Sequence, residues 1–77
     1  SALFWNRARQ LLNADQFECL WLRYQEELSI ADIAEALEKK VSAIKVALFR
    51  ARKTLSDHLQ EFHHLNSQVE PPTTPTH

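Results

Sequence analysis

Basic side chains are concentrated in one short stretch of this 77-residue chain. Residues 39–53 include six Lys or Arg and no acid, whereas residues 13–38 include seven acids and one Arg. Lys and Arg bind phosphate oxygens, so a basic stretch of this kind is typical of a nucleic-acid interface. The formal net charge is only −1, so the separation of charge along the chain, and not its sum, indicates this chemistry. A solvated helix face that keeps the protein soluble is the alternative explanation.

The other residues that could do chemistry are poorly placed for it. His58 and His63 are five residues apart, off the i, i+4 spacing that brings two metal ligands to one helical face, and Cys19 is the single thiol. Cys19 lies among apolar residues, so we expect a buried structural thiol. The chain has no Gly and therefore no Gly-rich loop for nucleotide phosphates. We predict no metal site, no cofactor and no enzymatic activity.

The elements that must position the basic residues are helices. Apolar residues recur every three or four positions, no segment alternates as a strand does, and Pro is confined to the last seven residues. We expect an all-α fold, a small four-helix domain at residues 1–64, with helices at about 2–12, 14–25, 30–37 and 41–63. The remaining segment, 65–77, has few apolar residues and three Pro, so it should be a disordered tail.

Capping patterns mark the starts of two helices. Asn13 with Gln16, and Ser29 with Asp32, have the three-residue spacing of a capping box. Trp5, in the first helix, is either a core residue or a contact to a partner.

The last two helices have the pattern of a helix-turn-helix. Residues 38–40 interrupt the apolar pattern of a short helix, and a longer apolar stripe then begins with a new phase. That stripe comprises Val41, Ile44, Leu48, Ala51, Leu55, Leu59 and Phe62. The long helix should therefore bury one side and present the other.

An ordered set of short motifs runs through the same region: Leu20 to Tyr24, Leu28-Ser29, Ile33-Ala34-Glu35, Ile44-Lys45, and Arg50 to Lys53 with Leu55. This set resembles region 4 of a bacterial sigma factor, in particular of the extracytoplasmic-function (ECF) type, and the resemblance covers residues 12–59. Glu38 stands where the family usually has Gly, which permits a positive φ, so we expect a strained or altered turn there. Val46-Ala47 stands where the family usually has Ser-Arg.

The resemblance implies a DNA-binding domain whose long helix enters the major groove of the −35 promoter element. Ser42, Ala43 and Val46 would meet base edges, the last two by apolar contact, for instance with a thymine methyl group. Phe49 would lie on the same surface. The candidate phosphate contacts are Lys39, Lys40, Lys45, Arg50 and Lys53. Arg52 would lie nearer the core, with its head solvated.

The resemblance also implies RNA polymerase core as a partner, whose flap-tip helix would bind an apolar groove. The candidate groove residues are Phe17, Leu20, Trp21, Leu28 and Ile33, and core packing is the alternative role of each. No apolar run is long enough to span a bilayer, so we expect a cytoplasmic protein without membrane insertion.

Two other functions remain open. The domain could be mainly a protein-interaction module, bound by an anti-sigma factor or by polymerase, with little DNA affinity of its own. It could also be a LuxR-type helix-turn-helix, which shares the LS, IAE and VK elements, although the terminal RARKTL argues against that family.

Overall fold

The computed structural model describes residues 2–58, which form four α-helices and no strand. They are α1 (Ala2–Leu11), α2 (Ala14–Tyr24), α3 (Ile30–Leu37) and α4 (Val41–His58). The all-α prediction is confirmed, and the first three helices agree closely with their expected ranges. The expected continuation of α4 to residue 63 and the tail at 65–77 lie outside the described residues.

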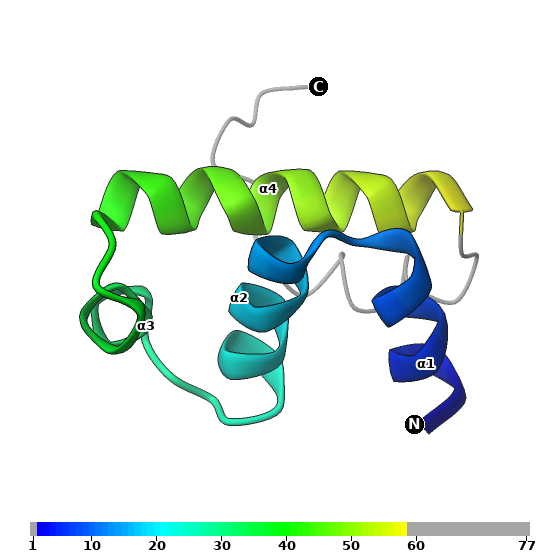
Figure 1. The fold of residues 1–77 in the computed structure, drawn as a ribbon, viewed down its shortest axis with the longest axis horizontal. Helices are drawn as coiled ribbons and strands as arrows, with labels where there is room; N and C mark the ends of the chain where they lie inside the picture. The colour runs from blue at the N-terminus through cyan, green and yellow to red at the C-terminus, as the bar shows by residue number, and fades with distance from the viewer. Residues whose placement is uncertain (1, 59–77) are drawn as a thin grey trace, which may run out of the picture.

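The long helix α4 is the element on which the others pack. Figure 1 shows α1, α2 and α3 on the same side of α4, with α3 near its first turn and α1 towards its other end. Each of the three contacts α4, and α2 also contacts α1 and α3. The opposite side of α4 is not covered by any of the described helices.

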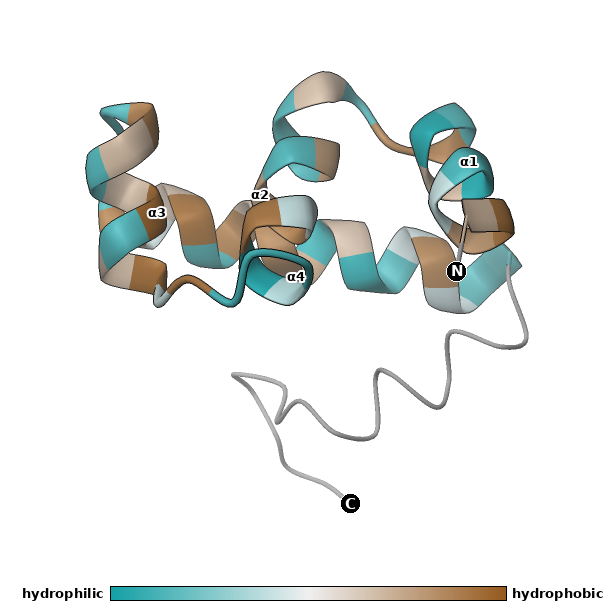
Figure 2. Ribbon diagram, turned by 90° about the horizontal axis from the view of Figure 1, so that it is seen from below, coloured by the Kyte–Doolittle hydropathy of each residue, from teal (hydrophilic) through white to brown (hydrophobic). Residues whose placement is uncertain are grey.

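The core is built from the apolar stripes of these helices. Figure 2 shows the ribbon of α4 alternating between hydrophobic and hydrophilic segments along its length. Four residues of its predicted stripe, Ile44, Leu48, Ala51 and Leu55, are buried. They meet Leu20 and Cys19 of α2 and Ile33 of α3, which are also fully buried. Helices this short depend on such packing for their stability.

The turn between α3 and α4 requires a positive φ, as expected from the sequence. Glu38 ends α3 with φ 56° and ψ 49°, in the left-handed region. Its N–H donates to the carbonyl of Glu35, and the N–H of Lys39 donates to the carbonyl of Ala34 at 2.9 Å. These two bonds form a Schellman motif, made here by a residue that carries a Cβ. Such a residue costs about 1–2 kcal/mol in this region.

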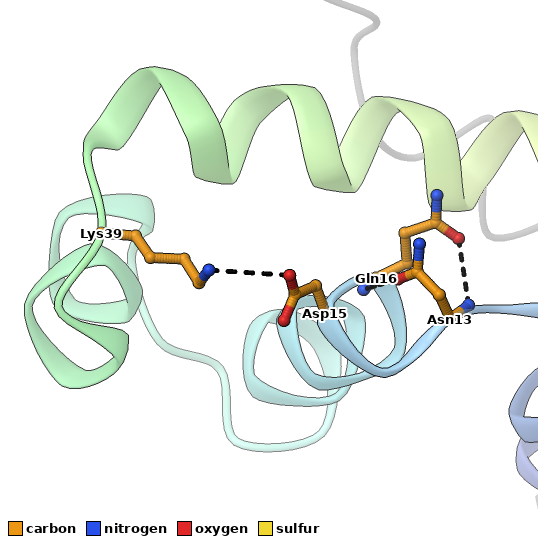
Figure 3. A network of polar contacts seen from close by, with 4 residues as sticks. All are labelled: Asn13, Asp15, Gln16 and Lys39. Carbon is orange, nitrogen blue, oxygen red and sulfur yellow. Dashed lines mark hydrogen bonds and ion pairs between the residues drawn. The ribbon is translucent and has the colours of Figure 1, made fainter.

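The two predicted capping boxes have different outcomes. The Oδ1 atom of Asn13 accepts from the N–H of Gln16 at 2.8 Å, and the Gln16 side chain accepts from the N–H of Asn13 at 3.3 Å (Figure 3). The Ser29 hydroxyl accepts from the N–H of Asp32 at 3.0 Å. The return bond of a capping box, from the N–H of Ser29 to the Asp32 carboxylate, is not formed between these two described residues. That part of the prediction was wrong because Asp is one methylene shorter than the Glu or Gln that reaches back.

Candidate nucleic-acid interface

All nine residues predicted to contact DNA are exposed: seven lie on α4 outside its buried stripe, and Lys39 and Lys40 lie in the turn before it. We call this set the basic face: Lys39, Lys40, Ser42, Ala43, Lys45, Val46, Phe49, Arg50 and Lys53.

Helical periodicity explains why the sequence produces this face. The core residues of α4 at positions 44, 48, 51 and 55 recur every three or four residues and fall on one side of the helix. Positions 42, 46, 49, 50 and 53 fall on the other side of the helix, and position 45 lies at the flank between the two sides. One helix thus serves both as the centre of the core and as an open surface.

Arg52 does not belong to the basic face. It is only 8% exposed, and its Nη1 donates to the hydroxyl of Tyr24 at 3.4 Å. The expectation that its head is solvated was wrong, because position 52 lies at the border of the stripe that packs on α2. Arg52 therefore helps to hold α4 on α2.

Two of the lysines on the basic face form ion pairs at the surface. Lys39 Nζ lies 3.6 Å from Asp15 Oδ2 at the start of α2 (Figure 3), and Lys53 Nζ lies 3.8 Å from Asp57 Oδ2. Exposed pairs of this kind contribute roughly 0–1 kcal/mol, so either lysine can exchange its carboxylate for a phosphate. Within residues 2–58, Lys40, Lys45 and Arg50 have no ion pair.

A hollow of about 390 Å³ lies between the first turn of α2 and the basic face. Ser42, Ala43, Val46, Ala47 and Arg50 line it from α4, and Asn13, Asp15 and Gln16 line it from α2. The sequence analysis missed the contribution of α2, because it treated Asn13 and Gln16 only as caps. No sequence signal could have found it, since only the packing of α2 on α4 brings these residues together.

A second hollow lies on the surface of α1 and α2 and is partly aromatic. Trp5 makes edge contacts with Phe17 and Trp21, with ring centroids 5.8 Å and 5.0 Å apart, and the Arg9 guanidinium lies 4.4 Å from the centre of the Phe17 ring. We call the neighbouring space, of about 600 Å³, the aromatic hollow. It is lined by Arg9, Leu12, Ala14, Phe17, Glu18, Trp21 and Leu22.

The five predicted groove residues differ in how deeply the structure buries them. Phe17 and Trp21 are half-buried and line the aromatic hollow. Leu28 is half-buried in the loop after α2, outside that hollow. Leu20 and Ile33 are 0% exposed, so they are core residues and no partner can contact their side chains in this structure. Sequence periodicity does not separate the two roles, because both kinds of residue lie on apolar helix faces.

Among the described titratable groups outside these two surfaces is the single thiol, Cys19. Burial of Cys19 raises the pKa of its thiol, and the nearby carboxylates of Asp15 and Glu18 raise it further, so the thiol stays protonated and unreactive at neutral pH. Residues 2–58 contain no cluster of three or more His, Cys, Asp or Glu suited to a metal ion. Three of the four histidines lie beyond these residues, so the predicted lack of a metal site stays a prediction. None of the described helices is long and apolar enough to cross a membrane.

A short helix, a tight turn and a second helix with an open basic face define a helix-turn-helix domain of the DNA-binding class. Residues 7–55, more than half of the chain, match the family model described as Sigma-70, region 4. The chain therefore belongs to the sigma-70 region 4 family, whose members are non-enzymatic domains of transcription factors that interact with DNA and RNA polymerase. This result favours the sigma-factor interpretation over the LuxR-type alternative. Neither the search of curated proteins nor that of solved structures found a match.

Proposed function

We propose that this chain is region 4 of an ECF-type sigma factor, and that α4 enters the major groove of the −35 promoter element. The observation that carries the proposal is the exposure of all nine residues of the basic face, seven of them on α4 and two in the turn just before it. An α-helix fits the major groove, where side chains from its first turns reach base edges. In this arrangement Ser42, Ala43 and Val46 face the bases.

The phosphate contacts would supply most of the affinity. Lys39 and Lys40 precede the N-terminus of α4, which is the positive end of the helix dipole, so both features attract a phosphate to the same place. Lys45, Arg50 and Lys53 follow along the helix. If all five bind phosphates, the logarithm of the affinity should fall with the logarithm of salt concentration with a slope of about −4.5.

Selection from a randomised duplex pool at two salt concentrations tests this proposal. The chain should enrich one short motif, and the affinity should fall steeply with salt. Lys45→Glu should weaken binding to all duplexes about tenfold or more at low salt and make the salt slope shallower by about 1 or more. Arg7→Glu changes the charge equally at an exposed position on α1, away from the basic face, and serves as the control. Equal losses in the two variants would contradict the proposal.

We propose further that the aromatic hollow docks the flap-tip helix of RNA polymerase core. Half-buried Phe17 and Trp21 offer apolar area on a concave surface, as helix-in-groove recognition requires. An anti-sigma factor that binds the same hollow would compete with polymerase.

A cross-comparison of variants separates this docking from DNA binding. Phe17→Ala should weaken binding to RNA polymerase core about tenfold and leave DNA affinity unchanged, because Phe17 lies on α2 outside the basic face. Lys45→Glu should have the opposite pattern. If Lys45→Glu instead leaves both the DNA affinity and the binding to RNA polymerase core unchanged, the domain is mainly a protein-interaction module. Unfolding curves of both variants would show whether the fold is retained.

A further inference from the structure

Most of the large apolar side chains that are exposed among residues 2–58 belong to α4. Among residues 2–58, four large hydrophobic side chains are exposed, and three of them are on α4: Val41 at 42%, Val46 at 46% and Phe49 at 38%. The fourth, Leu3, is on α1. Val46 and Phe49 are three residues apart and therefore neighbours on the helix surface, with the basic residues Lys45 and Arg50 beside them. An exposed apolar pair bordered by basic residues is the feature from which the inference starts.

Three of the α4 residues at this surface have no hydrogen-bonding side chain. Ala43, Val46 and Ala47 line the hollow between α2 and α4 together with polar residues, and none of these three can donate to or accept from a base edge. In the major groove, guanine, adenine and cytosine are recognised through such hydrogen bonds. Thymine differs because it also presents a methyl group there.

We infer that Val46, with Ala43 beside it, recognises the C5-methyl group of a thymine, so that thymine methyl groups specify the centre of the DNA site. This inference rests on the proposed function, and it names the base feature that α4 selects. DNA is the occupant that fits this surface, because Lys45 and Arg50 flank Val46, are exposed and form no ion pair within residues 2–58. A protein partner for the same surface would need acidic groups around an apolar centre.

Burial of one methyl group against Val46 should change the affinity about fourfold. Ser42 and Arg50 line the same hollow and can form hydrogen bonds to other base edges, so the methyl group is the feature of the base that Val46 itself would select.

The test uses deoxyuridine, which pairs as thymine does and lacks only the methyl group. The 77-residue chain is first used to select duplexes from a randomised pool. Each thymine of the selected motif is then replaced singly by deoxyuridine, and affinities are measured for the wild type, Val46→Ala and Leu3→Ala. Val46 and Leu3 are both exposed apolar residues, so the Leu3 variant is a matched control, and unfolding curves verify the fold of both.

The expected result is one thymine whose replacement weakens wild-type binding about fourfold and has no effect on Val46→Ala, while Leu3→Ala behaves as the wild type. A selected motif in which no deoxyuridine has an effect, or one in which the effect is equal in Val46→Ala, overturns the inference and leaves the proposed function intact. A pool without any enriched motif overturns the proposed function and the inference with it. If Val46→Ala binds all duplexes as the wild type does but no longer binds RNA polymerase core, the surface recognises protein and the inference fails.

Discussion

At the scale of single residues, position 38 shows how this chain departs from the family pattern without losing the fold. Glu38 occupies the left-handed region that Gly adopts without steric cost. The Schellman bonds of the turn and the packing of α3 on α4 hold it there. The turn is therefore a place where stability can be gained without altering the basic face.

Replacement Glu38→Gly should stabilise the domain by about 1 kcal/mol, because it removes the steric cost of the left-handed conformation. For a domain of this size the unfolding midpoint should rise by about 4–8 °C. Glu38→Ala removes the same charge and retains a Cβ, so it should give no such gain. Thermal unfolding of the three proteins followed by circular dichroism measures the difference, and an equal gain in both variants would attribute it to charge.

At the scale of elements, α4 combines two roles, one in the core and one at the surface. Its inward side supplies Ile44, Leu48 and Leu55 to the core, and its outward side supplies the basic face. A substitution on α4 should therefore affect either stability or binding according to its position in the helical turn.

Leu48→Ala should destabilise the domain by about 2–5 kcal/mol, because it leaves a cavity where α4 packs on its neighbours. Val46→Ala, two residues earlier and exposed, should change the free energy of unfolding by no more than about 0.5 kcal/mol. Urea denaturation of both variants measures this contrast. Similar losses of stability would mean that the side of α4 carrying Val46 is covered in solution.

At the scale of the whole molecule, charge is separated between elements. The seven acids of residues 13–38 are all exposed on α2, α3 and their connections, whereas the basic face lies on and just before α4. Such a distribution orients the domain as it approaches a polyanion, with α4 foremost. Asp15 is the acid that the structure places against the basic face, through its ion pair with Lys39.

Asp15→Asn should raise DNA affinity about twofold to fivefold at low salt, because it frees Lys39 and removes a negative charge beside the bound phosphates. The gain should disappear at high salt, where the charge is screened. Glu26→Gln makes the same change in net charge in the loop after α2 and should have a smaller effect. Fluorescence anisotropy titrations at several salt concentrations would decide this, and an unchanged affinity for Asp15→Asn would mean that Lys39 makes no phosphate contact.

The sequence by itself determined the helices, the turn and the exposed residues of α4. These features depend on local order: apolar residues at helical spacing fix which side of α4 is buried, and the Asn13 and Ser29 caps fix where α2 and α3 begin. The charge separation is likewise a property of the sequence order. For these reasons the fold class and the nine exposed residues of the basic face could be predicted.

Tertiary structure alone decided which apolar residues are core and which are surface. Leu20 and Phe17 lie on the same apolar side of α2, yet the first is fully buried in the core and the second remains half-buried beside Trp5 of α1. The contacts of Asp15 with Lys39, and of Arg52 with Tyr24, join residues far apart in the sequence. They depend on the angle at which α2 crosses α4, which arises from the packing of the whole core and is encoded by no single segment.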